Sequence, residues 1–502
     1  SLVIKPVGTK TAPLNSIAPG ELPGYTGWAR PENTLARYFR ISRNHYDVRN
    51  RQFTVSVECT DCATRSKRAK PCASRFFLRA YGPAVVPGTK TGALPTGTNG
   101  CSYSFWFPLY DPGVYTIEAV LTVSKPLPME AFPLYPNQEE PNYEGYLLPG
   151  FPMTTTVPFG ETSNDPASLA TSEAGLCHFE DLVETWSNSA AERARWKVTG
   201  RVNERDYWSK TMNSSLVSTL GYMTNVNSLG INMEYRYFNN CRLIQEESLL
   251  RRDKRPVLVG GCQGPQEKLH IVYIGDSVMR VQKDTLEKFL KGIPSERVEV
   301  TFLSLHGGYR KNQALGPANV TQFLQDLRTK TAKQNENVVI LFNTGLHDIH
   351  RLCGSEFRDE RPTYLDKNRL VSFKCVDEYR LLLKDFVNEI HNFPAALKVF
   401  QSTTAAWPKY GNYGIDWNQN AQGMVLVSDF CDAFNEIAFE VLKGFPQIQI
   451  MDGYWITYAR PDNREIGDIG KKLSHPGVEV LSAMTRKWVM LMMDRVCLPL
   501  VV

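Results

Sequence analysis

The sequence predicts an α/β fold class, a doubly wound parallel five-stranded sheet, preceded by an all-β sandwich. Up to about Lys125, segments rich in β-branched and aromatic residues are separated by Gly, Pro and Asn turns at the spacing of a sandwich. From Leu269 onward, apolar strand-like runs alternate with amphipathic helix patterns, which is typical of crossover connections between parallel strands. The length of 502 residues also exceeds that of one ordinary domain.

Composition narrows the class of protein. Apolar residues make up 42% of the chain and charged residues 22%, which excludes disordered, collagen-like and coiled-coil proteins. The net charge of +5 is spread over the sequence without a long basic run, so we expect no nucleic-acid partner. The longest uninterrupted apolar run, 488–493, is far shorter than the roughly 20 residues of a membrane-spanning helix, so no membrane span is expected in this sequence.

The cysteines predict an oxidising compartment. Eleven Cys lie mostly near expected strand ends and loops, a placement that favours disulfides and the secretory pathway, either the Golgi lumen or the extracellular space. Two N-glycosylation sequons begin at Asn213 and Asn319, and the first residue, Ser1, is compatible with the removal of a signal peptide or membrane anchor. For Cys59, Cys62, Cys72 and Cys101 we favour disulfides over a four-thiolate zinc site.

The predicted β domain covers residues 1–125. Its expected strands are 35–41, 52–59, 74–81, 101–109 and 113–124. The turn Asp111-Pro112-Gly113, followed by a strand that bears Tyr115, resembles the closing strands of filamin-type immunoglobulin-like repeats. We expect a Pro- and aromatic-rich linker over 126–163 and an irregular segment over 164–265 that packs on the catalytic domain.

The predicted α/β domain covers residues 266–502. Its expected strands are 269–274, 298–305, 337–342, 397–402 and 448–451, and its expected helices are 277–291, 319–333, 375–392, 428–443 and 478–496. In such sheets a ligand binds beyond the carboxyl ends of the strands, where the strand order reverses. The residues that follow each strand are therefore the candidates for function.

Three strand ends carry residues suited to acyl chemistry. Gly275-Asp276-Ser277 follows the first strand and opens a helix, whose free N–H groups and positive end favour a nucleophile. The Ser277 N–H, an N–H of Gly307 or Gly308 after the second strand, and the Asn343 amide after the third predict an oxyanion hole. The alternatives are a helix cap at Ser277 and a turn-closing Asn343.

A serine nucleophile needs a general base. His475 is the best placed histidine, because it precedes the last expected helix at the same end of the sheet; a buried structural histidine is the alternative. Arg280, one turn into its helix, is a candidate for substrate binding or an ordinary exposed Arg. Trp407 lies among aromatic residues that suit either sugar stacking or loop packing. No metal is expected, since the pair His347 and His350 lacks a third spaced ligand.

Three short sequence motifs resemble those of a known family. Gly-Asp-Ser-x-x-Arg at 275–280, Phe-Asn-Thr-Gly at 342–345 and His-Pro-Gly at 475–477 look like the SGNH/GDSL hydrolase superfamily, and in particular its PC-esterase branch. That branch holds glycan O-acetyltransferases of the trichome-birefringence-like and sialate types and the neurexophilin-and-PC-esterase proteins, which also carry an immunoglobulin-like N-terminal domain. The resemblance implies a Ser-His enzyme that moves acetyl groups to or from sugar hydroxyls. A glycan or glycoprotein is then the partner, with no bound cofactor and with acetyl-CoA as a candidate donor.

One departure from the family affects the catalytic triad. The branch has Asp three residues before the catalytic His, whereas this chain has Lys472. The orienting group is then Asp452, Asp468 or a backbone carbonyl, because the third member mainly fixes the tautomer and orientation of the ring. The departure also keeps open a second hypothesis, an inactive relative that serves as an extracellular glycan-binding or structural protein. The choice between transferase and esterase, and the state of self-association, stay open.

Overall fold

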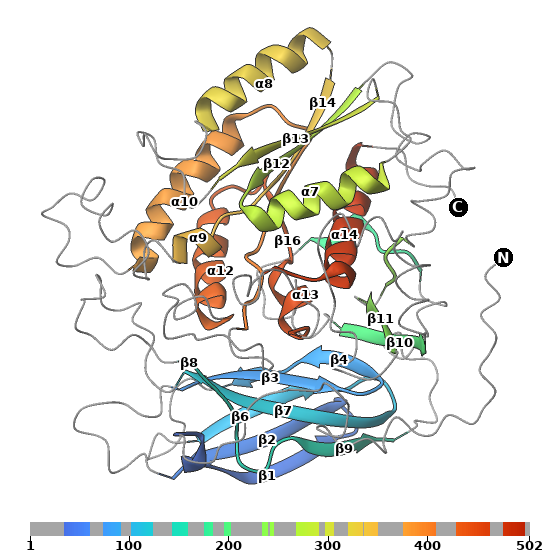
Figure 1. Ribbon diagram of the computed structural model, residues 1–502, viewed down its shortest axis with the longest axis vertical. Coiled ribbons are helices and arrows are strands. Elements are labelled where there is room, and N and C mark those ends of the chain that lie inside the picture. Colours follow the sequence, from blue (N-terminus) through green and yellow to red (C-terminus); the bar gives the residue numbers. More distant parts are fainter. Residues whose placement is uncertain are drawn as a thin grey trace, which may run out of the picture.

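The computed structural model describes the chain in fifteen stretches and shows two joined parts, a β sandwich and an α/β unit (Figure 1). The described residues are 35–60, 74–91, 102–123, 143–158, 175–183, 195–201, 233–238, 241–244, 268–290, 297–305, 320–334, 336–349, 375–407, 428–461 and 475–496.

The α/β unit is built on a five-stranded parallel sheet. Its strands are β12 (Lys268–Gly275), β13 (Val298–Ser304), β14 (Glu336–Phe342), β15 (Leu397–Gln401) and β16 (Gln449–Met451). Their order is β13-β12-β14-β15-β16, and every neighbouring pair is parallel. This confirms the predicted parallel five-stranded sheet. The strand order reverses between β12 and β14, which is where a ligand site is expected in a doubly wound sheet.

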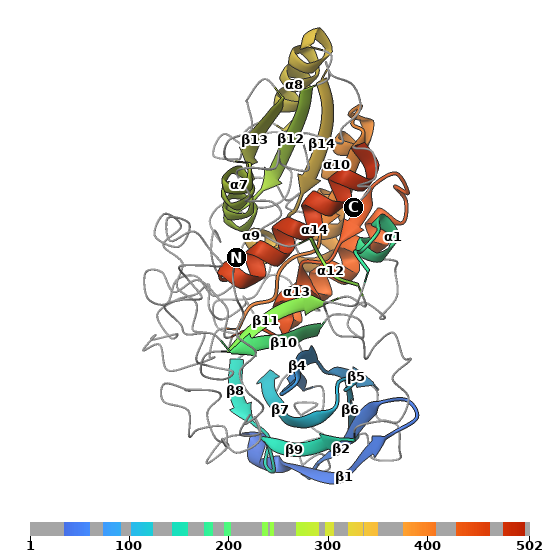
Figure 2. The ribbon, with the colours of Figure 1, turned by 90° about the vertical axis from the view of Figure 1, so that its right-hand side faces the viewer.

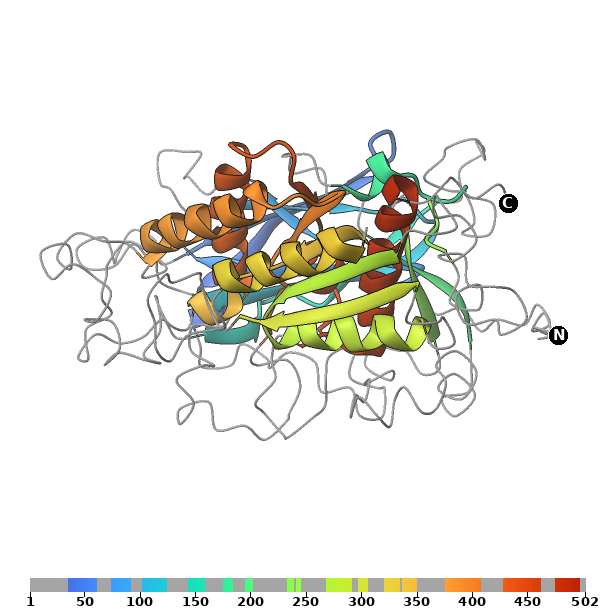
Figure 3. The ribbon, with the colours of Figure 1, turned by 90° about the horizontal axis from the view of Figure 1, so that it is seen from above.

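Helices cover both faces of this sheet, as the view from above shows (Figure 3). Side chains alternate along β12, so that Ile271 and Tyr273 join one core cluster and Val272 and Ile274 another. The first cluster includes residues of α7 (Ser277–Phe289) and α14 (Val478–Val496). The second includes residues of α8 (Val320–Gln334), α10 (Cys375–Asn392) and α12 (Ser428–Leu442). Burial on both faces explains the nearly continuous apolar runs of these strands.

The β sandwich consists of two antiparallel sheets. One has the order β1-β2-β6-β5, with β1 (Phe39–Asp47), β2 (Gln52–Cys59), β6 (Ser102–Pro108) and β5 (Thr89–Thr91), and follows the short helix η2 (Leu35–Tyr38). The other has the order β11-β10-β4-β3-β7-β8, with β11 (Met233–Phe238), β10 (Arg195–Arg201), β4 (Ala84–Pro87), β3 (Arg75–Tyr81), β7 (Gly113–Val123) and β8 (Tyr143–Leu147), while β9 (Met153–Val157) also pairs with β7. The immunoglobulin- or filamin-like assignment stays a prediction.

Two segments expected to lie outside the sandwich contribute strands to it. β8 and β9 fall within the expected linker and pair with β7. β10 and β11 fall within the expected irregular segment, and β10 pairs with β4. These strands have five to seven residues, and their partners lie far away in the sequence, so local periodicity gave little sign of them. Figure 2 shows β10 and β11 between the rest of the sandwich and the α/β unit.

The two parts share a packed interface. The Tyr458 hydroxyl, in the short helix α13 (Tyr454–Tyr458), accepts the N–H of Leu78 in β3 at 3.0 Å. The Trp196 indole N–H of β10 donates to the carbonyl of Ile456 at 3.2 Å. Side chains of both parts belong to one hydrophobic cluster, so the sandwich buries apolar surface of the α/β unit.

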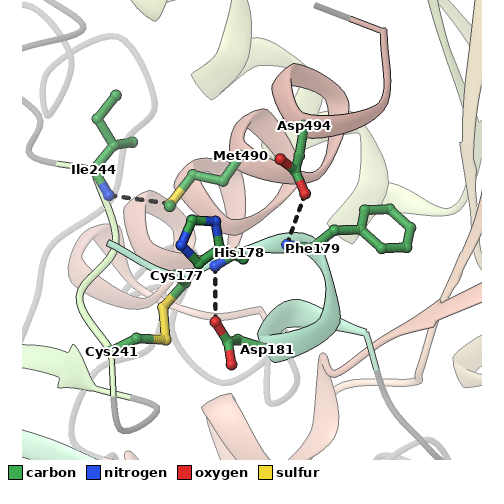
Figure 4. The surroundings of a disulfide bond; sticks show 8 residues. All are labelled: Cys177, His178, Phe179, Asp181, Cys241, Ile244, Met490 and Asp494. Atoms are coloured by element: carbon green, nitrogen blue, oxygen red, sulfur yellow. Dashed lines mark hydrogen bonds between the residues drawn. A yellow bond between two sulfur atoms is a disulfide. The ribbon is translucent and has the colours of Figure 1, made fainter. Parts of the chain in front are cut away.

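A disulfide joins Cys177 and Cys241 next to α14 (Figure 4). The short helix α1 (Phe179–Leu182) follows Cys177, and the Phe179 N–H donates to Asp494 of α14 at 2.8 Å. The bridge bears out the disulfide expectation for these two cysteines; Cys62, Cys72 and Cys101 lie outside the described residues. Within the described ranges, no helix combines the length and apolar character needed to cross a membrane.

Candidate active site

The turn between β12 and α7 places Ser277 at the start of a helix. Asp276 is the N-cap, and its carboxylate accepts the Val278 N–H at 2.9 Å. A Cβ at Gly275 would lie 2.5 Å from the Met279 side chain and 3.1 Å from the Asn343 carbonyl oxygen, so this close approach favours glycine. Ser277 is the first helical residue, and its N–H has no acceptor within the helix.

Neighbouring strands hold this turn from both sides. The Leu305 N–H, after β13, donates to the Gly275 carbonyl at 2.7 Å. The Asn343 N–H, after β14, donates to the Ile274 carbonyl at 3.0 Å. The ends of the three strands are therefore fixed side by side at the point where the strand order reverses. Gly307 and Gly308 lie outside the described residues, so their part in an oxyanion hole stays a prediction.

The side chains of Ser277 and His475 meet at this edge of the sheet. Ser277 Oγ lies 2.7 Å from His475 Nε2, a hydrogen-bond distance between residues far apart in the sequence. His475 is buried and Ser277 is half-buried. A serine hydroxyl on the Nε2 atom of a neutral imidazole can transfer its proton to the ring as the oxygen attacks an electrophile.

Asn343 lies buried beside the turn. Its Nδ2 atom donates to the Gln401 carbonyl of β15 at 2.7 Å, which uses one of two amide hydrogens. The contact fixes the orientation of the amide and leaves the second N–H for another acceptor. The role of that N–H in binding an oxyanion stays a prediction.

A buried polar network supports the loops behind Asn343. Asn435 of α12 accepts the Thr403 N–H at 2.7 Å and donates to the Thr403 carbonyl at 3.0 Å. The Thr403 hydroxyl and the Tyr379 hydroxyl both donate to the Thr344 carbonyl at 3.1 Å, and Thr344 hydrogen-bonds Asp348 in α9 (Leu346–Asp348). This network was not predicted from the sequence. The one available signal was a polar Asn435 among apolar residues on the core-facing side of α12.

Asp452, a candidate third member of the triad, lies at the start of α13. Its two carboxylate oxygens accept the N–H groups of Trp455 and Ile456, at 2.8 and 2.9 Å, at the start of α13. Burial raises the pKa of Asp452, and the positive charge of Lys487 opposes that rise. Each oxygen can accept a further hydrogen bond, and the part of Asp452 as the orienting group of His475 stays a prediction. Asp468 and Lys472 lie outside the described residues.

The two predicted substrate-binding residues differ in exposure. Trp407 is only 1% exposed, and its indole N–H donates to the Tyr458 carbonyl at 3.1 Å. Its ring therefore packs in the core and offers no face to a sugar, which favours the packing alternative. Arg280 is exposed on α7, one turn after Ser277, and its role in binding stays a prediction.

The described part of the chain contains no cluster of three or more His, Cys, Asp or Glu residues arranged to hold a metal ion. In the segment 347–350, which contains the two histidines considered as metal ligands, Asp348 is fully buried and hydrogen-bonds Thr344. His350 lies outside the described residues.

Comparisons of this chain with known proteins find similar solved structures and no match by sequence. No protein-family model and no curated protein matches the sequence. Among solved structures, the acetylxylan esterase Axe2 of Geobacillus stearothermophilus is similar over 46% of this chain and 96% of its own, with 11% identity and a TM-score of 0.27. The protein YxiM of Bacillus subtilis is similar over 95% of both chains, with 9% identity and a TM-score of 0.26. The resemblance to the PC-esterase branch stays a prediction, and the function proposed below rests on the geometry of the site.

Proposed function

We propose that this protein is an acyltransferase or esterase that moves an acyl group, usually acetyl, to or from a sugar hydroxyl through an acyl-Ser277 intermediate. The observation that carries the proposal is the 2.7 Å contact between Ser277 Oγ and His475 Nε2 at the strand-order reversal. A serine paired with a histidine at the start of a helix has both the base and the positive helix end that nucleophilic catalysis requires.

The proposed reaction begins with attack on the acyl carbonyl. As Ser277 Oγ bonds to the carbonyl carbon, its proton passes to His475 Nε2, and the carbonyl oxygen becomes an oxyanion. The first-turn N–H of Ser277 and the remaining amide N–H of Asn343 are the described donors for that oxygen. The imidazolium then gives its proton to the departing atom, the oxygen of an ester or the sulfur of a thioester donor, and the acyl group stays on Ser277.

The second half of the reaction decides the product. When water attacks the acyl-enzyme, with its proton taken by His475, the protein acts as an esterase. When a sugar hydroxyl attacks, it acts as a transferase, and acetyl-CoA is then a candidate acyl donor. The glycan or glycoprotein substrate is the one that the sequence resemblance implies. The Cys177–Cys241 disulfide supports the proposal that the protein works in the secretory pathway.

The test combines a chemical probe with turnover. The purified protein is treated with a fluorophosphonate probe and, separately, with p-nitrophenyl acetate. We expect labelling and acetate release by the natural protein, and loss of both in Ser277→Ala. Absence of labelling of the folded natural protein, or labelling that persists in Ser277→Ala, would contradict the proposal.

A second candidate is a non-catalytic glycan-binding protein. It is favoured by Lys472 at the position where the PC-esterase branch has Asp. Unlabelled protein that retains glycan binding would support this second candidate.

A further inference from the structure

Buried charged residues lie at both ends of α13, and each end has a residue of opposite charge on α14. The Arg460 guanidinium, just after α13, pairs with the Glu479 carboxylate in the first turn of α14 at 2.5 Å, and both side chains are almost completely buried. The Arg460 guanidinium also lies over the Trp196 ring of β10, 4.7 Å from its centroid. This pair therefore joins α13, α14 and the β sandwich.

The second region lies at the other end of α13. Asp452 precedes the helix, and the positive charge of Lys487, two turns beyond Glu479, interacts with its carboxyl group. Along α13 the charges run from negative at 452 to positive at 460, and along α14 from negative at 479 to positive at 487. The Arg460–Glu479 contact is made in one register of α14. A shift of α14 by one turn would move Glu479 about 5.4 Å away from Arg460.

The register of α14 determines the position of the base. His475 lies three residues before Val478, the first residue of α14, and four before Glu479. The helix backbone begins with the Leu481 N–H donating to the Gly477 carbonyl at 2.9 Å. Ser277, in contrast, is fixed by β12 and α7. The two reacting atoms are therefore held by separate elements, and their distance depends on where α14 starts.

We propose that Arg460 and Glu479 are positioning residues, which fix the start of α14 so that His475 Nε2 lies on Ser277 Oγ. The inference rests on the proposed function. It adds that the β sandwich contributes to the geometry of the site through Trp196, which packs on the Arg460 guanidinium. Neither residue touches the reacting atoms.

The chain offers a matched control for this pair. Arg79 and Glu118 in the β sandwich form a second buried Arg–Glu pair, with a 2.7 Å contact and both side chains almost fully buried. Arg79 also donates to the Ala459 carbonyl at 3.5 Å, and a change of Glu118 keeps both of these groups in the protein. The Arg79 guanidinium also lies over aromatic rings, as does that of Arg460. Loss of either carboxylate removes one charged partner of a buried guanidinium, so both changes lower stability. Of the two pairs, only Arg460–Glu479 involves α14, the helix that His475 precedes.

The experiment compares Glu479→Gln with Glu118→Gln in the full chain. We expect similar decreases in melting temperature, but a rate of fluorophosphonate labelling lowered by about tenfold or more only in Glu479→Gln, because misplacement by about 1 Å is costly. Amide hydrogen exchange should rise in the peptide that covers residues 475–482 in Glu479→Gln and stay unchanged in Glu118→Gln. Equal labelling rates in the two variants, or unchanged exchange in this peptide, would overturn the proposal.

A double variant separates position from stability. Arg460→Met with Glu479→Leu replaces the pair by apolar side chains, a change that often restores stability. We expect the melting temperature to recover while labelling stays slow; recovery of both would show that the pair acts through stability alone. If the natural protein is not labelled, the proposed function fails, and the exchange measurement still tests the positioning.

Discussion

The side-chain amide of Asn435 makes two hydrogen bonds to the backbone of Thr403: it accepts the Thr403 N–H at 2.7 Å and donates to the Thr403 carbonyl at 3.0 Å. The two hydrogen bonds take the place of a strand partner for the loop after β15. Thr403 in turn binds the Thr344 carbonyl, next to Asn343. A residue on a helix thereby holds the loop that borders the candidate active site.

Replacement of Asn435 by Ala should destabilise the protein and slow its reaction. The Thr403 N–H and carbonyl would be left buried without this partner, at a cost of about 1 to 3 kcal/mol for each unsatisfied group. Urea unfolding measures the change in the free energy of unfolding. Asn388→Ala, an exposed change on α10, is the control and should stay within about 0.5 kcal/mol of the natural protein. Equal stabilities of the two variants would contradict this role of Asn435.

Replacement of Gly345 by Ala should also be destabilising. Gly345 has φ of 147°, and a Cβ there would lie 2.1 Å from the Thr403 hydroxyl oxygen. We expect a loss of more than about 1 kcal/mol in the free energy of unfolding. Gly175→Ala is the matched control, because a Cβ at Gly175 meets no atom within 4 Å. A Gly345→Ala protein as stable as Gly175→Ala would show that the loop can rearrange at little cost.

The carboxyl group of Asp432 on α12 should make stability depend on pH. Burial raises the pKa of Asp432 to about 7, and the nearby Glu436 and Asp429 contribute to the rise. An acid whose pKa is higher in the folded state binds more protons there. Its contribution to stability is therefore complete below the ordinary pKa of about 4 and is lost as the pH rises through about 7.

Denaturant unfolding at several pH values tests this expectation. The free energy of unfolding of the natural protein should include a component that decreases between about pH 4 and 7, and Asp432→Asn should lack it. Identical pH profiles of the two proteins would contradict the assignment to Asp432.

Removal of the Cys177–Cys241 disulfide should lower stability while leaving the site intact. The bridge closes a sequence separation of 64 residues, and loss of a native disulfide typically costs about 2 to 5 kcal/mol. Unfolding of Cys177→Ser with Cys241→Ser, compared with the natural protein with and without reductant, measures the cost. Reductant should lower the stability of the natural protein by more than that of the double variant, and a double variant of unchanged stability would contradict the prediction.

Much of the α/β sheet could be predicted from the sequence because its signals are local. The strands are buried on both faces and read as apolar runs, and the intervening helices carry their apolar residues on one side. The contact of Ser277 with His475 followed from topology, since both were expected at the carboxyl edge of the same sheet.

Other features depend on contacts that no local pattern records. β8 to β11 are short, and each depends on a hydrogen-bond partner: β8 and β9 pair with β7, β10 with β4, and β11 with β10. Trp407 suited either sugar stacking or loop packing by its sequence, and the structure buries it, with its indole N–H on the Tyr458 carbonyl. In each case a long-range partner decided the role.

The most direct test of the account is to find where an acyl group is held. The protein is mixed with p-nitrophenyl acetate, quenched in acid and digested, and the peptides are examined by mass spectrometry. We predict an acetyl ester on Ser277, formed about 100 to 10,000 times more slowly in His475→Ala because the general base is lost. No acetyl group on Ser277 of the natural protein, or an equal rate of acetylation in His475→Ala, would contradict the central claim.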